Sequence, residues 1–425
     1  MNPSDKGWLK KYVSFRSENP LNEDYTLLLK SLSANQSVEE FIYVVNQPSG
    51  IIYGYPVNFS NVPVPGEDEW NEKDKMKIIL LESILHTSIY KYYSQKKYAI
   101  DFHDYEKSVK DASLYFVRAY PQLVQKKYAF FGPKDDHFSV LERIIDKRIN
   151  IRTGWNKNFV SGLFHNSLLF LDIIGFAKWI TSDKKEKVTA SSEEVRLEIL
   201  KTIAAAAASN GTIENEERRL YNFFLQSAWL SDIAENEARK YIDESVGLSD
   251  LNFHFIDKWI QRKFILELAI LTCWSDKELD LQEKKFLEEL IPLLNLDIDE
   301  LENSLLAIES FVIGNWENIY FLSGKGNYRI VSSKLQKRLN LALKRNKRKL
   351  RQEIYESKEL VELLVKSTRE DLSDEEKKKV KDQLVDIIKT IPAFAIFMVP
   401  GGSVLLPILL KILPKNILYP SSFQD

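Results

Sequence analysis

The sequence is poor in the residues that cross-link a chain or interrupt its helices. Its 425 residues include one cysteine, 15 glycines and 14 prolines. A single cysteine, Cys273, excludes an intramolecular disulfide, and its neighbours Leu271 and Trp274 indicate a position in a hydrophobic core. Proteins built from short strands and tight turns contain more glycine and proline than this. We therefore expect a mainly α-helical protein, and a reducing compartment fits the low cysteine content.

Signals of catalysis are also missing. The chain has no Walker loop, no dinucleotide-binding glycine motif, no Gly-x-Ser-x-Gly and no His-Glu-x-x-His. The five histidines are scattered, and the polar clusters around His103 and His137 have no second ligand pair at a recognisable spacing. We interpret these clusters as surface loops. Together, these absences favour a non-enzymatic protein.

The chain has neither a large excess of one charge nor a signal peptide. Its 59 Lys and Arg and 61 Asp and Glu give a formal net charge of -2. Contact with nucleic acid or anionic lipid therefore requires a local basic patch, and we expect no DNA partner. The charged N-terminus, residues 1–11, is not followed by an apolar stretch, so we predict that the main body is cytoplasmic.

What the chain does have is enough length for several helical bundles. A chain of 425 residues favours roughly two to four domains. We predict an N-terminal helical domain of unknown type at residues 1–185 and a helical bundle with an internal repeat at residues 192–312. Residues 313–425 are predicted to contain a basic amphipathic helix and a hydrophobic helical segment broken by proline and glycine.

Local signals define three features of the N-terminal region. Ser37 and Glu40 have the spacing of a helix-capping box. Turn residues on both sides of residues 51–55 favour a short extended or hairpin element there. The apolar stretch 159–180 is long enough to cross a bilayer, but a carboxylate at Asp172 is costly in hydrocarbon. We therefore predict that this stretch is a buried helix of a soluble domain.

The central region contains a repeat with a period of 66 residues. The segment 208–220 aligns with 274–286, and each copy places an apolar helix before a short acidic turn and a second helix. Acidic residues at the start of that second helix suit the positive end of its dipole. The alanines at 204–208 permit close approach of a neighbouring helix.

This layout resembles the TerB-like domain associated with tellurite resistance, a helical bundle whose acidic turn residues are thought to bind a metal. The resemblance implies a divalent-cation site formed by Glu214, Glu217, Asp276, Asp280 and Glu283. Two residues depart from the family pattern: Asn210 stands where a carboxylate is expected, and Lys277 occupies the glycine position. The acids do not form an EF-hand, and dipole compensation at the helix start is the alternative explanation for them.

The C-terminal region begins with a strongly basic stretch. Between residues 334 and 352 there are nine basic residues and no acid: Lys334, Lys337, Arg338, Lys344, Arg345, Lys347, Arg348, Lys349 and Arg351. An apolar stripe runs through the same stretch at Leu335, Leu339, Ala342, Leu350 and Ile354, which predicts one basic amphipathic helix. Its cations could contact anionic lipid, bind RNA phosphates, or form a solvated face paired with acids elsewhere. Further on, Ser373 and Glu376 predict the capping box of another helix.

Residues 391–410 are twenty consecutive residues without a charge, which is long enough to cross a hydrocarbon core as a helix. Proline and glycine interrupt this stretch, so a kinked span or a hairpin insertion is favoured over a straight helix. Burial against a soluble domain is the third alternative. The residues that define this predicted membrane segment are Ile391, Pro392, Phe394, Pro400, Gly401, Gly402 and Pro407.

The passage 372–423 is similar to the membrane segment of the Letm family, which is named for a leucine zipper, EF-hands and a transmembrane region. The similarity rests on ordered prolines in residues 391–394, 399–400, 405–407 and 413–414, and on the final Pro-Ser-Ser-Phe. In the family a large ribosome-binding, matrix-facing domain follows this segment, and we expect none here. The resemblance therefore implies membrane association, but neither ribosome binding nor cation–proton exchange is inherited from it. It is nearest to short bacterial Letm-related proteins described as biofilm-associated.

These patterns predict a non-enzymatic, membrane-associated scaffold or a stress- and biofilm-related protein. Its TerB-like bundle would bind a protein partner or respond to metal, and its partners would be membrane lipid, other proteins or a second copy. More lysines precede residues 391–410 than follow them, which favours the cytoplasmic side of a bacterial inner membrane. The alternatives are ribosome binding and a part in cation–proton exchange, which would need oligomerisation because one segment cannot enclose a pathway.

Overall fold

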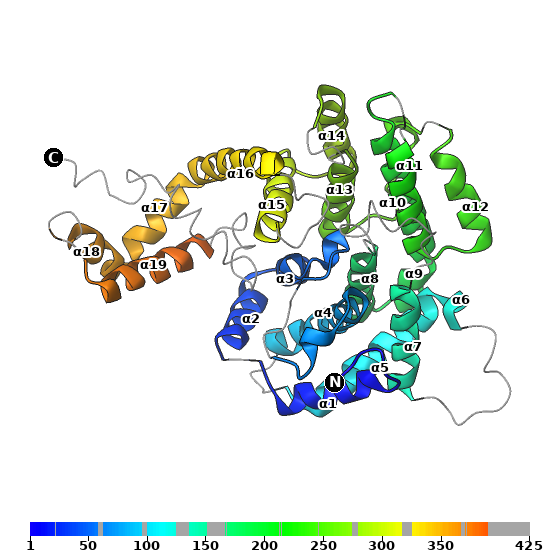
Figure 1. The fold of residues 1–425 in the computed structure, drawn as a ribbon, viewed down its shortest axis with the longest axis horizontal. Coiled ribbons are helices and arrows are strands. Elements are labelled where there is room, and N and C mark those ends of the chain that lie inside the picture. The colour runs from blue at the N-terminus through cyan, green and yellow to red at the C-terminus, as the bar shows by residue number, and fades with distance from the viewer. Residues whose placement is uncertain are drawn as a thin grey trace. The chain divides into compact units, whose positions relative to one another are not determined.

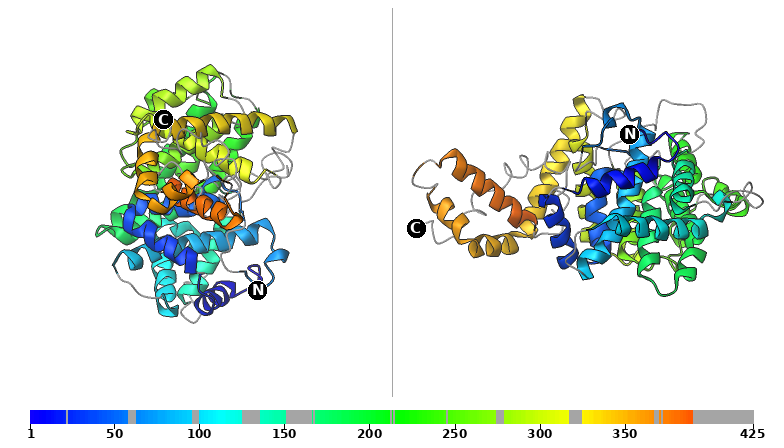
Figure 2. Two further views of the ribbon diagram at one scale, coloured as in Figure 1. Left: turned by 90° about the vertical axis from the view of Figure 1, so that its left-hand side faces the viewer. Right: turned by 90° about the horizontal axis from the view of Figure 1, so that it is seen from below.

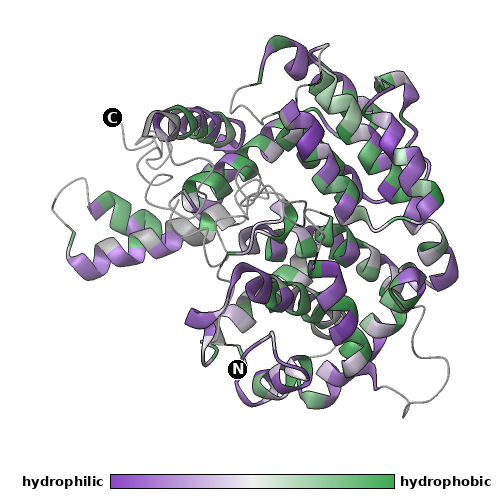
Figure 3. Ribbon diagram, turned by 45° about the vertical axis from the view of Figure 1, so that its right-hand side comes forward, coloured by the Kyte–Doolittle hydropathy of each residue, from purple (hydrophilic) through white to green (hydrophobic). Residues whose placement is uncertain are grey.

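A computed structural model describes most of the chain before residue 390. The described residues are 1–21, 23–57, 63–95, 100–124, 136–150, 166, 168–211, 213, 215–244, 246–273, 279–316, 325–366, 370 and 372–389. Every regular element among them is an α-helix or a 3₁₀ helix (Figure 1). Figure 3 shows hydrophobic and hydrophilic residues together along most helices, as expected where one face of a helix is buried. The mainly α-helical prediction is confirmed.

The chain divides into two compact units, Met1–Leu301 and Glu302–Asp425. The three-part division at residues 185 and 313 stays a prediction. The hydrophobic segment that follows residue 390 lies outside the described residues.

The first part of unit 1 is a group of packed helices. They are α1 (Trp8–Glu18), α2 (Glu23–Asn35), α3 (Val38–Asn46), α4 (Glu72–Gln95), α5 (Phe102–Ala119), α6 (Pro121–Val124), α7 (His137–Ile149), α8 (Leu169–Thr181) and α9 (Lys185–Ala190). Helix α5 packs on α7, and α4 packs on α2 and α8. The predicted capping box of Ser37 and Glu40 starts α3, where the Glu40 amide donates to Ser37 Oγ over 3.3 Å.

The extended element predicted at residues 51–55 is wrong. Three short 3₁₀ helices follow α3 instead: η1 (Gln47–Ser49), η2 (Ile51–Tyr53) and η3 (Glu67–Glu69). Gly50 and Gly54 flank η2 with φ angles of 79° and 65°, a left-handed conformation that glycine adopts without strain. The glycines therefore lie in turns, as predicted, but these turns connect short 3₁₀ helices and not strands.

Helix α8 contains the described part of the apolar stretch at residues 159–180, and it is buried as predicted. Its Asp172 is 1% exposed and forms an ion pair with Arg148 of α7 over 2.8 Å. The Tyr120 hydroxyl also donates to this carboxylate. A buried charge is tolerated when a partner and hydrogen bonds satisfy it. Within the described residues, no helix combines the length and apolar character needed to cross a membrane.

The 66-residue repeat is present as two successions of three helices. The first is α10 (Ser192–Ala207), α11 (Asn215–Ala228) and α12 (Asp232–Tyr241); the second is α13 (Trp259–Cys273), α14 (Leu281–Leu293) and α15 (Asp299–Gly314). The ends of α10 and α13 are 66 residues apart, and so are the starts of α11 and α14. A short 3₁₀ helix, η4 (Leu248–Asp250), lies between the copies. These helix ends fit the predicted 66-residue period.

The two copies meet through their first helices. Helix α10 packs along α13 (Figure 1). The alanines at 204–207 are at most 2% exposed. Small side chains let two helix backbones approach closely. The predicted role of the alanine run is confirmed for these residues.

Unit 2 contains α16 (Lys325–Arg345), α17 (Lys347–Glu356), α18 (Lys358–Lys366) and α19 (Asp374–Lys389). The basic stretch is therefore two helices, and the prediction of one continuous helix is wrong. The break falls at Asn346, whose side-chain amide donates to the carbonyl of Ala342 over 2.9 Å. Asparagine is a poor helix former because its side chain competes for backbone hydrogen bonds.

The apolar stripe of the basic stretch survives this break. Leu335, Leu339, Leu350 and Ile354 are each at most 2% exposed. Helices α17, α18 and α19 pack on one another, as the views in Figures 1 and 2 also show. The predicted capping box starts α19, because the Glu376 amide donates to Ser373 Oγ over 3.2 Å.

Candidate functional site

The acidic residues at the start of α14 form a helix cap. One carboxylate oxygen of Asp280 accepts hydrogen bonds from the backbone amides of Gln282 and Glu283, at 2.7 and 2.8 Å. The Glu283 carboxylate accepts the Asp280 amide in return, at 2.8 Å. This reciprocal arrangement satisfies amides that the first turn of a helix leaves unpaired. The geometry therefore fits dipole compensation and capping.

The metal prediction for the acidic turns stays a prediction. Glu214 and Asp276 lie outside the described residues, so two of the five predicted ligands cannot be placed. Among the residues that are described, no three His, Cys, Asp or Glu side chains are grouped closely enough to hold an ion.

The repeat does bring acids from both copies to one place, around Cys273. Glu217 of the first copy and Glu283 of the second are 7% and 6% exposed. Burial raises the pKa of the Cys273 thiol, and the charges of Glu283, Glu217 and Asp280 raise it further. This environment disfavours a thiolate, so Cys273 has the chemistry of a core residue and not of a nucleophile.

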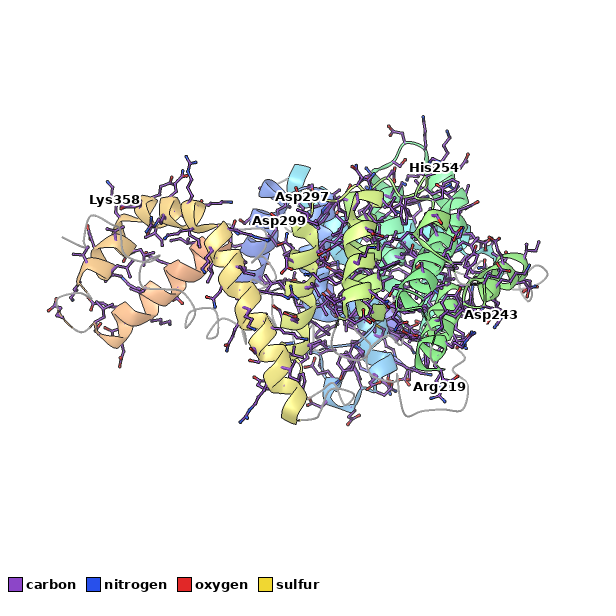
Figure 4. The ribbon with its side chains drawn as sticks, turned by 90° about the horizontal axis from the view of Figure 1, so that it is seen from above. Arg219, Asp243, His254, Asp297, Asp299 and Lys358 are labelled. Atoms are coloured by element: carbon purple, nitrogen blue, oxygen red, sulfur yellow. The ribbon has the colours of Figure 1, made fainter. Side chains whose placement is uncertain are left out.

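A cavity of about 550 Å³ lies near this point, formed by the end of α10, the start of α11, residues 242–248 and α14. Its polar lining residues are Ser209, Arg218, Asp243, Gln282, Lys285 and Glu289. Arg218 and Asp243 form an ion pair across 2.5 Å (Figure 4, which labels Asp243). Sequence reasoning missed this cavity, because it is made by segments that only the packing of the helices brings together.

The predicted basic residues fall into two groups. Lys337, Lys344, Arg345, Arg348 and Lys349 are exposed on α16 and α17, whereas Lys334, Lys347 and Arg351 are partly buried. Arg338 is also partly buried, and it is bound by two acids of α15: its Nε lies 3.1 Å from both carboxylate oxygens of Glu309, and its Nη1 lies 2.5 Å from Glu302. For Arg338, the interpretation as a cation paired with acids elsewhere fits the geometry.

Glu309 has an unusual protonation equilibrium. Burial raises its pKa to about 7, although Arg338 and Lys334 act in the opposite direction. Its side chain is 1% exposed, so the charged form loses most of its hydration. We therefore expect the contact between α15 and α16 to depend on pH close to neutrality.

Helices α17, α18 and α19 are joined by polar contacts as well as by their apolar faces. The Ser357 hydroxyl donates to Gln383 over 3.0 Å, and Lys379 pairs with Glu359 over 3.0 Å. The Lys366 ammonium lies 2.6 Å from Glu376. These contacts join α19 to Ser357, at the end of α17, and to α18. Helices α17, α18 and α19 therefore form one small bundle.

Comparison with known families identifies the passage that begins at α19. Residues 372–425 match the family model described as LETM1-like, RBD, where RBD denotes a ribosome-binding domain. The C-terminal part of this chain is similar to the Letm family. No curated protein and no solved structure gave a significant match. The Letm-related passage fits a membrane-associated, non-enzymatic protein.

The Letm match corrects one interpretation of the sequence. We expected the ribosome-binding domain of the family to follow residues 372–423 and to be missing, but the matching model is named for that domain and covers this passage. The predicted membrane residues, Ile391, Pro392, Phe394, Pro400, Gly401, Gly402 and Pro407, all lie outside the described residues. The TerB-like, biofilm-related and bacterial assignments stay predictions.

Proposed function

We propose that this chain is a non-enzymatic, membrane-associated protein that binds ribosomes through its Letm-related C-terminal unit. The observation that carries the proposal is the match of residues 372–425 to the LETM1-like ribosome-binding family. A hydrophobic segment within the same passage, residues 391–410, would place the protein at a bilayer. The protein would then act as a scaffold that holds ribosomes near a membrane.

The basic residues of α16 and α17 supply the surface that such binding needs. Ribosomal RNA presents a dense array of phosphates, and neutralising them releases counterions and gives salt-dependent affinity. Five cations of this stretch are exposed, and two of them are arginines, whose planar guanidinium matches phosphate geometry. The stretch lies directly before the Letm-related passage, and α17 packs on α19 within it.

Co-sedimentation of the full chain with purified ribosomes tests this proposal. We expect the protein to pellet with ribosomes at low salt and to be released as salt is raised. The variant Lys337→Gln/Lys344→Gln/Arg348→Gln removes three exposed cations, so its binding should weaken and the salt dependence should become shallower by about two to three contacts.

A matched control separates a local surface from a general charge effect. Lys110, Lys184 and Lys187 are exposed lysines of unit 1, and replacing all three with Gln changes the net charge by the same amount. This control should bind ribosomes as the unchanged protein does. A full chain that stays in the supernatant even at low salt would contradict the proposed function.

A further inference from the structure

One face of α17 carries three different chemical groups in a row. Arg348, Gln352 and Tyr355 are at positions i, i+4 and i+7, so they lie on the same side of the helix. All three are exposed, and the Tyr355 side chain is 50% exposed. The residues that anchor α17, Leu350 and Ile354, are buried on another side. The face is therefore turned away from the contacts that fold the bundle.

The position of the cations on α17 is not explained by helix stability. Lys347, Arg348 and Lys349 occupy the first turn, where the positive end of the helix dipole disfavours cations. That turn contains no acid, and the side chain of Asn346 does not cap it. By contrast, Lys344 and Arg345 in the last turn of α16 stand where the dipole favours them. Arg348, the cation of this turn on the face considered, is therefore placed at some cost to the helix, which favours a partner of negative charge.

The exposed tyrosine narrows the kind of partner. A partner that offers only phosphates can be bound by cations alone, so its binding does not require a half-exposed aromatic ring. Single-stranded RNA offers unstacked bases as well as phosphates, and aromatic side chains stack on such bases whatever their sequence. A glutamine amide can also bond to the edge of a base. The Gln352 amide already donates to Glu356 over 3.0 Å, so Arg348 and Tyr355 are the groups that match the phosphate and the ring of an unpaired nucleotide.

We infer that this face, Arg348–Gln352–Tyr355, recognises an unpaired nucleotide of ribosomal RNA, with Tyr355 stacking on the base and Arg348 pairing with a phosphate. The inference rests on the proposed ribosome binding and specifies its chemistry. Duplex RNA does not offer this contact, because its bases are stacked in the helix. The affinity of the face should therefore be higher for unpaired than for duplex RNA.

Substitutions at Tyr355 distinguish a ring contact from other contacts. The probe is a short, unstructured, fluorescein-labelled RNA, and binding to the purified full chain is followed by polarisation. Tyr355→Phe keeps the ring and should bind as the unchanged protein does. Tyr355→Ala and Tyr355→Leu remove the ring, so both should bind about tenfold more weakly. A duplex of the same sequence should bind more weakly than the single strand and should not respond to these substitutions.

The leucine variant separates RNA from a membrane as the occupant of this face. Leucine inserts into a bilayer as readily as tyrosine, so vesicles containing phosphatidylglycerol should bind Tyr355→Leu unchanged if lipid is the partner. If Tyr355→Ala or Tyr355→Leu binds the RNA as tightly as the unchanged protein, the inference is overturned. The proposed function is not affected by that result as long as the full chain co-sediments with ribosomes. If the unchanged full chain does not co-sediment with ribosomes, the proposed function itself is overturned. Urea unfolding should show equal stability of the three variants, since Tyr355 is half exposed.

Discussion

At the scale of single residues, Asp280 and Glu283 have hydrogen bonds that compete with metal binding. One oxygen of Asp280 already accepts two backbone amides, and the Glu283 carboxylate accepts a third. A metal bound here would have to share these oxygens or use the remaining ones. Capping does not require the charge of Asp280, whereas metal binding does. A neutral replacement therefore distinguishes the two roles.

Asparagine caps a helix about as well as aspartate, whereas alanine does not cap it. If capping is the role of Asp280, Asp280→Ala should lower the free energy of unfolding by about 1 kcal/mol, and Asp280→Asn should change it little. EDTA should leave both variants and the unchanged protein unaffected. Urea denaturation monitored by circular dichroism measures these differences.

The opposite pattern would support the metal prediction instead. In that case calcium or magnesium should raise the stability of the unchanged protein, and Asp280→Asn should abolish this effect because a neutral amide is a weaker ligand for hard cations.

At the scale of helices, the Glu309–Arg338 pair makes the contact between α15 and α16 sensitive to pH. The pKa of Glu309 is raised from 4.5 to about 7 by burial. Between these values the folded protein holds a proton that the unfolded chain has lost. The stability that this group contributes is therefore fully present below about pH 4.5 and is lost as the pH rises through 7. The charged groups near Glu309 are Arg338, Lys334 and Glu302.

Amide hydrogen exchange in α16 measures this dependence, after correction for the intrinsic effect of pH on exchange. Protection should decrease from about pH 5 to about pH 8 in the unchanged protein. Glu309→Gln mimics the protonated form and should remove most of the decrease. Glu302→Gln is the matched control, because it removes another acid that binds Arg338 and should keep the pH dependence. An unchanged profile in Glu309→Gln would contradict the assignment.

The helices also show which features a sequence can predict. The repeat boundaries were predictable because similar residues recur at a fixed spacing, and each copy folds in the same way. The break at Asn346 was not, since the apolar stripe continues on both sides of it. The pairing of Arg338 could not be predicted either, because its acids lie on a different helix. The gathering of Glu217 and Glu283 around Cys273 likewise depends on packing between the copies.

At the scale of the whole molecule, the two compact units divide the predicted roles. Unit 1 contains the cavity and every helix of the repeat except α15, most of which belongs to unit 2. The buried ion pair between Arg148 and Asp172 in unit 1 explains how the otherwise apolar helix α8 keeps a carboxylate in the protein interior. Unit 2 contains the exposed cations and the Letm-related passage. Ribosome binding and membrane association are both proposed for unit 2, and a truncation tests the membrane part.

A chain truncated after Lys389 keeps helices α16–α19 and loses residues 391–410. We expect the full chain to remain with carbonate-washed membranes, because twenty uncharged residues give a strong hydrophobic contribution to membrane insertion. The truncated chain should appear in the supernatant, and its ribosome binding should weaken without being lost, because most of residues 372–425 is removed while the basic face of α16 and α17 is intact. Circular dichroism would show whether its helical content is kept. If the full chain also left the membrane in carbonate, residues 391–410 would have to be buried within the protein, and the membrane part of the proposal would be wrong.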